Sequence, residues 1–201
     1  MSSELIARLQ RFRAEHFPRY REHYQRLIAE GQNPATLFIG CSDSRVVPDQ
    51  LLGTRPGELF IVRNVGNFVP PFEDDAGFHG VSAGIEFGVA ILGVSDVVVC
   101  GHSHCGAIRA LYDQPNPATP HINRWLQLGM EARVDEPISE EMLRRTEQRS
   151  IALQLERLMT FPAVRERVEA GKLALHGWHY IIEEGTVMIL DVESGRFVAA
   201  G

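Results

Sequence analysis

The stretch DVVVCGHSHCGAI, residues 96–108, contains the pattern that decides the fold. Its first part is a short apolar run ending in glycine, which is typical of a strand buried on both faces of a parallel sheet. From Cys105 onward the stretch reads as the start of a helix. A strand followed by a helix is the repeating unit of α/β proteins. The stretch therefore predicts a strand over 96–101 within such a sheet.

The same kind of pattern recurs on both sides of this stretch. Further strands are predicted at TLFIG (36–40) and ELFIVRNVG (58–66), and a terminal hairpin at KLALHGWHYII (172–182) and TVMILDV (186–192), followed by a turn at ESGR. Helices are predicted over 80–93 and 139–160, from Cys105, and from Pro162. The prediction is an α/β fold: a mostly parallel central β-sheet flanked by helices, with an N-terminal helical arm and a C-terminal hairpin strand.

The beginning of the chain reads as a helix over residues 3–30, with apolar residues at helical spacing. Pro18 is expected to kink or divide it. A length of 201 residues suits one sizeable core, so we predict one domain over 1–201, of which residues 1–30 form the arm. The pattern allows the arm to pack on a partner subunit or on its own core.

Charge and composition exclude several classes of protein. The net charge is −6, which argues against binding to nucleic acid or to an anionic membrane surface. No apolar run is long enough to span a bilayer, and the N-terminal stretch lacks the apolar region of a secretory signal. Three cysteines, an odd number, do not suggest a disulfide framework. We therefore predict a cytoplasmic protein, in which clustered Cys and His favour a metal site.

Two motifs, Cys41-Ser-Asp-Ser-Arg45 and His102-Ser-His-Cys105, each follow a predicted strand. Ligands of such sheets bind beyond the carboxyl ends of the strands. Two cysteines and one histidine match a catalytic zinc site, which keeps one position open for water. Asp43 and Arg45 suit a bidentate pair that keeps the carboxylate ionised.

Rival ligands are present in the same motifs. His104 competes with His102, and the spacing to Cys105 favours His102 only mildly. Cys100 competes as a cysteine, but it ends an apolar strand and is expected to be a buried, inert thiol. The remaining histidines show no ligand spacing and are expected in the core or on the surface: His16, His23, His79, His121, His176 and His179.

Four segments together resemble the β-class carbonic anhydrases: CSDSRVVP, PGELFIVRNVGNFVPP, GIEFGVAILGVSDVVVCGHSHCGAI and GWHY. The resemblance is dense over residues 28–110 and thinner to the end. It implies reversible hydration of CO2 to bicarbonate and a proton, by attack of zinc-bound hydroxide. It also implies one Zn²⁺ per chain.

The resemblance assigns roles to individual residues. It implies that Cys41, His102 and Cys105 bind the zinc, that Asp43 accepts a hydrogen bond from the zinc-bound water or hydroxide, and that Arg45 holds Asp43. The family builds its CO2 pocket at a subunit interface, so a homo-oligomer, a dimer or tetramer, is expected. By position the pocket residues are Gln32, Phe60, Val65, Phe87 and Gly106.

One subgroup of the family is inhibited by bicarbonate at a second site, where Asp replaces water on zinc and leaves its arginine. That site uses Trp, Arg and Tyr. Here Arg63 and Tyr180 match, but Phe38 stands at the Trp position. We therefore expect a normally open zinc, with Asp43 as a ligand only in a possible closed state.

Two other functions fit the same motifs. Related proteins with these ligands hydrolyse carbonyl sulfide or carbon disulfide. A non-catalytic, zinc-stabilised assembly protein is the alternative of another class, although a structural zinc usually has four protein ligands. Replacing Asp43 separates an enzyme, which loses activity, from a scaffold, which keeps its zinc and assembly.

Overall fold

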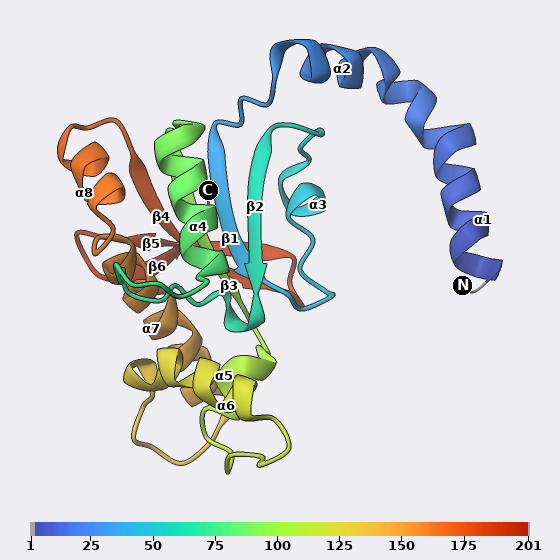
Figure 1. The fold of residues 1–201 in the computed structure, drawn as a ribbon. Helices are drawn as coiled ribbons and strands as arrows, with labels where there is room; N and C mark the ends of the chain where they lie inside the picture. Colours follow the sequence, from blue (N-terminus) through green and yellow to red (C-terminus); the bar gives the residue numbers. More distant parts are fainter. Residues whose placement is uncertain (1–2, 201) are drawn as a thin grey trace. The chain divides into compact units, whose positions relative to one another are not determined.

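The computed structural model describes residues 3–200, which form two compact units divided between Asn33 and Pro34 (Figure 1). The first unit contains α1 (Ser3–Arg11), the π-helical turn η1 (Phe12–His16) and α2 (Phe17–Glu30). The predicted helical arm is thus present. Pro18 lies in the first turn of α2, where its missing N–H costs little, and the π-helical turn directly precedes that helix.

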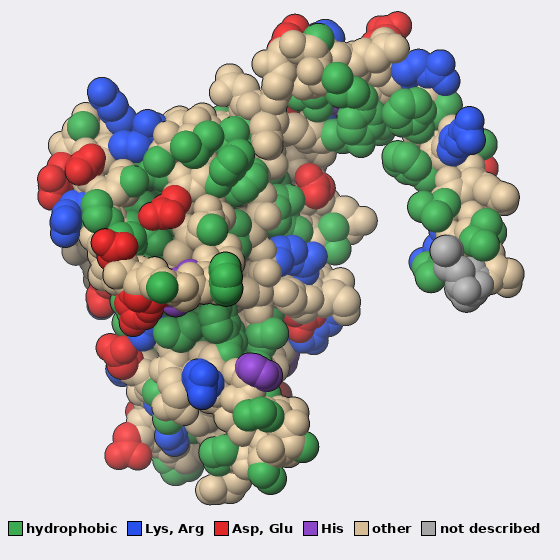
Figure 2. Space-filling view, in the orientation of Figure 1, with side chains coloured by type: hydrophobic (Ala, Val, Ile, Leu, Met, Phe, Trp, Pro, Cys, Tyr) green, Lys and Arg blue, Asp and Glu red, His purple; other side chains and the backbone are tan. Residues whose placement is uncertain are grey.

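Apolar side chains of the first unit are exposed to solvent. None of the residues in α1, η1 or α2 is buried within this chain. The exposed apolar residues include Leu5, Ile6, Leu9, Phe12 and Ile28, and Figure 2 shows hydrophobic side chains gathered on these helices. The first unit therefore does not bury an apolar core of its own.

The second unit is built on a six-stranded sheet with the order β2-β1-β3-β4-β5-β6. Its strands are β1 (Thr36–Cys41), β2 (Leu59–Asn64), β3 (Asp96–His102), β4 (Ala174–Ile181), β5 (Thr186–Asp191) and β6 (Arg196–Ala199). The first four strands in this order run parallel, and β5 and β6 are antiparallel to their neighbours. The predicted α/β fold is confirmed. The sheet is mixed, because β5 is antiparallel to β4 and β6 is antiparallel to β5.

Helices connect and cover the strands. They are α3 (Pro48–Leu52), α4 (Gly80–Glu86), α5 (Gly106–Ala110), α6 (Pro120–Leu126), α7 (Glu140–Leu158) and α8 (Pro162–Glu169), with the short turns η2 (Val65–Asn67), η3 (Phe87–Ile91) and η4 (Gln127–Ala132). The sequence did not predict α3, α6 or η4. Ser139 caps α7 by accepting a hydrogen bond from the Met142 N–H.

Alternating side chains of the central strands supply two separate cores. Leu37, Ile39, Val97 and Val99 point to one face of the sheet, where they pack in the main cluster with residues of α7 and α8. Phe38, Val98 and Cys100 point to the other face and form a smaller cluster. The central strands are thus buried on both faces, as their uninterrupted apolar sequences predict.

The register of the parallel strands brings two chain segments together at one edge of the sheet. Gly40 of β1 is paired with Cys100 of β3, so the residues that follow each strand emerge side by side. Both predicted motifs begin at this edge. Within residues 3–200, no helix combines the length and apolar character needed to cross a membrane.

Candidate metal centre

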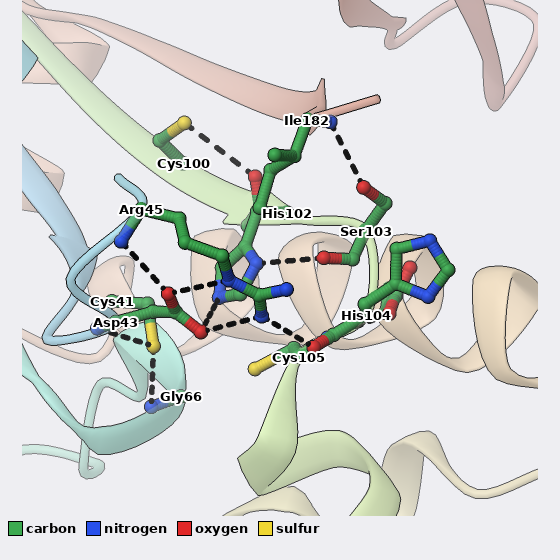
Figure 3. A network of polar contacts seen from close by, with 12 residues as sticks. Cys41, Asp43, Arg45, Gly66, Cys100, His102, Ser103, His104, Cys105 and Ile182 are labelled. Atoms are coloured by element: carbon green, nitrogen blue, oxygen red, sulfur yellow. Dashed lines mark hydrogen bonds and ion pairs between the residues drawn. The ribbon is translucent and has the colours of Figure 1, made fainter. Parts of the chain in front are cut away.

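Three side chains from the two motifs form a compact, buried cluster at this edge (Figure 3). Cys41 ends β1, His102 ends β3, and Cys105 directly precedes α5. The two sulfurs and one imidazole nitrogen all lie within 4.8 Å of one another. The three residues are almost completely shielded from solvent. The fold therefore brings together one candidate ligand from β1 and two from the end of β3.

The His102 ring is oriented by the backbone. Its Nδ1 lies 2.8 Å from the carbonyl oxygen of Ser103, so Nδ1 carries the proton and donates. Nε2 is buried and has no hydrogen-bond partner within residues 3–200. An unpartnered buried nitrogen is costly unless another group satisfies it. Its lone pair is therefore free for a metal ion, which is what a histidine ligand requires.

The rival ligands lie outside this cluster. His104 adopts a left-handed conformation with φ of 57°, and its side chain is half exposed near Glu183. Cys100 points to the opposite face of the sheet, where burial raises the pKa of its thiol to about 12. The preference for His102 over His104, and the inert role expected for Cys100, both agree with this placement.

The two cysteine sulfurs interact directly. The hydrogen bond from Cys105 lowers the pKa of the Cys41 thiol, against the effect of burial. The same hydrogen bond, together with burial, raises the pKa of Cys105. The backbone N–H groups of Asp43 and Gly66 each donate to Cys41 Sγ at 3.4 Å. A thiolate at Cys41 is thus stabilised before any metal binds.

Gly66 is required at its position by both conformation and space. Its φ is 82°, and a Cβ atom there would lie 2.9 Å from the Ala107 Cβ. Glycine reaches this backbone region without steric cost. It can therefore present its N–H to Cys41 in the narrow gap between η2 and α5.

Asp43 and Arg45 form the bidentate pair that the sequence predicts. Asp43 Oδ1 accepts from the Arg45 backbone N–H and from Nε, both at 2.9 Å, and Oδ2 accepts from Nη2 at 2.8 Å. The Arg45 side chain holds the pKa of the Asp43 carboxyl below its usual range. Oδ2 lies 3.9 Å from His102 Nε2, so an ionised oxygen faces the cluster.

Arg63 fixes the segment that contains the first motif. Its Nε donates to the Cys41 carbonyl at 2.9 Å, and its Nη2 donates to the Asp43 carbonyl at 2.8 Å. The sequence pointed to Arg63 only as part of a second bicarbonate site. Here it holds the backbone on both sides of Ser42.

The five predicted pocket residues occupy different places. Val65 lines a cavity of about 870 Å³ beside Ser42, with an apolar wall that includes Pro70, Ile122 and Trp125. Gly106 opens α5 directly after Cys105, and a Cβ there would meet empty space.

The other three do not line this cavity. Phe60 and Phe87 stack with ring centroids 5.6 Å apart. Phe60 lies four residues along β2 from Asn64, the partner of Cys41, which is roughly 13 Å. Gln32 is an exposed residue of the first unit.

Several residues near the cluster carried no sequence signal. Glu147 of α7 accepts from the Cys105 N–H at 3.1 Å and pairs with His179 of β4 at 3.0 Å. The Ser103 hydroxyl donates to Glu183 at 2.6 Å, which lowers the pKa of that carboxyl to about 2. Each contact joins residues far apart in the sequence. Only the fold reveals them.

A second group of possible metal ligands lies on the surface. Glu73, Asp75 and His79 come within 4.8 Å of one another, and all three are exposed. His79 Nε2 is 2.7 Å from Asp75 Oδ1, so the group is explained as a surface ion pair.

Comparisons with known proteins agree with this geometry. A family model described as carbonic anhydrase matches residues 36–187. A carbonic anhydrase of Pseudomonas aeruginosa is 41% identical over 98% of this chain and 90% of its own length. The structure of the β-carbonic anhydrase CcaA has a TM-score of 0.89 and 37% identity, covering 98% of both chains. One of two tetrameric β-carbonic anhydrases of Sordaria macrospora has a TM-score of 0.82 and 28% identity, covering 94% of this chain and 98% of its own.

The chain therefore belongs to the carbonic anhydrase family, in its β class. The resemblance seen in the sequence is confirmed, and with it the prediction that the protein is an enzyme, a carbonic anhydrase.

Proposed function

We propose that this protein hydrates CO2 reversibly to bicarbonate, using one zinc ion held by Cys41, His102 and Cys105. The observation that carries the proposal is the buried cluster of two sulfurs and the free His102 Nε2 within 4.8 Å. Two thiolates and a neutral imidazole are a donor set that zinc favours, and three protein ligands leave a position for water. When bound there, zinc would lower the pKa of water and so supply a nucleophile near neutral pH.

Asp43 would orient that nucleophile. Its carboxylate, kept ionised by Arg45, can only accept hydrogen bonds. With Oδ1 occupied by two donors, Oδ2 is the oxygen that faces the cluster and can accept one more. A nucleophile that donates a hydrogen bond to Oδ2 turns a lone pair away from the carboxylate, toward CO2. Arg45 is thus a positioning residue, and Asp43 touches the reacting atoms.

The intact Asp43–Arg45 pair supports an open zinc position. Moving Asp43 onto the metal would break its two side-chain hydrogen bonds with Arg45. A second bicarbonate site has little support. Phe38, which stands where that site needs Trp, is fully buried and makes an edge-to-face ring contact with Trp178. Arg63, which the second bicarbonate site would also need, is instead engaged by the backbone carbonyls of Cys41 and Asp43.

The substrate pocket would be completed by a second copy of the chain. CO2 is small and apolar, and the cavity beside Ser42 offers an apolar wall. Phe87 is 42% exposed and lies outside that cavity with Phe60, so both suit the pocket of a neighbouring subunit. Gln32, an exposed residue of the first unit, is proposed separately as a substrate-binding residue. A dimer or tetramer follows, as in the tetrameric relatives of Sordaria macrospora. A cytoplasmic location stays a prediction.

The test is stopped-flow hydration of CO2 by the purified protein and by Asp43→Ala, with zinc content measured on the same samples. We expect one zinc per chain in both proteins, and a fall in hydration of about 100-fold or more in the variant. Asp49→Ala, which removes a different carboxylate, on the nearby helix α3, is the control and should keep full activity. Full zinc without hydration in the wild type would refute the proposal. Activity on carbonyl sulfide or carbon disulfide would then identify a hydrolase, and inactivity a scaffold.

A further inference from the structure

We propose that Glu147 and His179 act as a buried positioning pair for the metal centre, by holding the peptide bond that precedes Cys105. The inference rests on the proposed zinc site and deepens it. Neither residue touches the candidate ligand atoms, and their effect is exerted through the backbone.

The peptide between His104 and Cys105 is held at both ends. Its carbonyl oxygen accepts from Arg45 Nη2 at 3.0 Å (Figure 3). Its N–H donates to Glu147 Oε1 at 3.1 Å. One peptide unit therefore connects the partner of Asp43 on one side with a buried carboxylate on the other. A shift of this peptide would move Cys105 Sγ and release one contact of Arg45.

This peptide needs such support because of the residue before it. His104 has φ of 57°, a left-handed conformation that residues other than glycine seldom adopt. Conformations of this kind persist where surrounding contacts impose them. The hydrogen bonds from Arg45 and to Glu147 fix the peptide bond on the C-terminal side of His104.

Because both side chains are buried, the carboxylate of Glu147 depends on the few donors around it. Glu147 is 4% exposed and His179 is completely buried. A carboxylate in such a place is stable only when its oxygens accept hydrogen bonds. Oε1 accepts a hydrogen bond from the Cys105 N–H, and Oε2 lies 3.0 Å from His179 Nε2. Because a carboxylate oxygen can only accept, the His179 Nε2–H is the donor to Glu147. The other ring nitrogen, Nδ1, has no partner in the described part of the chain.

The pair also joins three elements around the cluster. Glu147 belongs to α7, and His179 lies on β4 opposite Gly101, the residue before the ligand His102. Cys105 caps α5 without a side-chain hydrogen bond at that helix start. The carboxylate of Glu147 therefore fixes the start of α5 against α7 and β4.

Gln154 supplies a matched control for a purely structural role. It lies two helical turns along α7, is fully buried, and accepts the Val69 N–H through Oε1 at 2.8 Å. Its contact is of the same kind as that of Glu147, but it does not reach a candidate ligand. Gln154→Ala should lower thermal stability and leave metal binding unchanged.

The experiment compares the wild type with Glu147→Ala, Glu147→Gln and Gln154→Ala. Zinc dissociation constants are measured by competition with a chelator, and the cobalt-substituted proteins are examined for thiolate-to-cobalt absorption. We expect Glu147→Ala to raise the zinc dissociation constant by about 10- to 100-fold and to alter the cobalt spectrum. Glu147→Gln keeps an oxygen for the Cys105 N–H and should recover most of the affinity.

A dissociation constant for Glu147→Ala within about twofold of the wild type, or an equal rise in Gln154→Ala, would overturn the inference. If Glu147→Ala does not fold, His179→Phe decides, because it removes the donor to Glu147 and keeps a ring of similar size. Unchanged zinc affinity in His179→Phe would then overturn it. A wild type that binds zinc but does not hydrate CO2 would refute the proposed function. The comparison of zinc dissociation constants would still test the positioning role of Glu147 and His179.

Discussion

Replacing Arg45 with alanine tests the role given to the Asp43–Arg45 pair. The change removes the hydrogen bonds from Nε to Oδ1 at 2.9 Å, from Nη2 to Oδ2 at 2.8 Å, and from Nη2 to the His104 carbonyl at 3.0 Å. The bond from the backbone N–H of residue 45 to Oδ1 remains. The carboxylate therefore keeps one of three donors and is free to rotate. It stays near the cluster but is no longer aimed at it.

Stability and activity should respond very differently to this change. The Arg45 side chain is 47% exposed and that of Asp43 is 17% exposed. Ion pairs at such sites contribute at most about 1 kcal/mol to folding. Misplacement of a reacting group, in contrast, can cost about 100-fold in rate, or roughly 2.7 kcal/mol in the barrier. We expect hydration to fall about 10- to 100-fold while the free energy of unfolding changes by about 1 kcal/mol or less.

The pH dependence separates orientation from protonation. Arg45 holds the pKa of the Asp43 carboxyl below its usual range, so its loss moves that pKa upward, toward about 3.9. Asp43 is then still ionised across an assay from about pH 6.5 to 9. Stopped-flow hydration by Arg45→Ala should therefore be reduced by a similar factor at every pH in that range.

Recovery of the variant at high pH would show that the loss came from protonation and would refute this reasoning. Full activity with one zinc per chain would refute the positioning role itself. Arg45→Lys is the matched control. It keeps the positive charge but not the two-point geometry, so we expect an activity between those of the wild type and Arg45→Ala.

Three further predictions concern stability. Gly66→Ala forces a left-handed alanine against Ala107 and should cost about 2–5 kcal/mol in urea unfolding; a loss below about 1 kcal/mol would contradict the steric argument. Removing zinc with a chelator should lower the melting temperature, and Zn²⁺ but not Mg²⁺ should restore it, because thiolates are poor ligands for Mg²⁺. Ser103 holds the pKa of Glu183 near 2 when folded, against 4.5 unperturbed, so this carboxylate stabilises the fold above pH 4.5 and loses its effect as the pH falls toward 2. The difference in melting temperature between the wild type and Glu183→Gln should therefore shrink on acidification, and a constant difference would contradict it.

The sequence predicted the parts of the fold that depend on local pattern. The apolar runs at 36–40 and 96–101 gave the two central strands, because strands buried on both faces need no polar alternation. The apolar pattern over 139–160 predicted α7, and Pro162 marked the start of α8 through its fixed φ. Helix α6 was missed because it is only seven residues long and follows a proline-rich segment that reads as a loop.

The residues of the candidate site likewise include some that local spacing predicted and some that only the fold brings together. Cys41, Asp43 and Arg45 lie within five residues, so their spacing alone suggests a shared environment. Glu147 and His179 could not be predicted, because a glutamate on a helix and a histidine on a strand are ordinary until the fold places them at 3.0 Å. For His104, a left-handed backbone conformation left no trace in the sequence, since it is imposed by distant contacts.

The pairing of β1 with β3 also has a consequence for how the chain acquires its structure. Gly40 pairs with Cys100, sixty residues later, with β2 added outside β1 rather than between them. Joining such distant segments closes a long loop and is a slow step in folding. Until it occurs, Cys41 and Cys105 are separate, accessible thiols that oxidants can reach. We therefore expect the yield of refolded protein to depend on reductant and on zinc being present during loop closure.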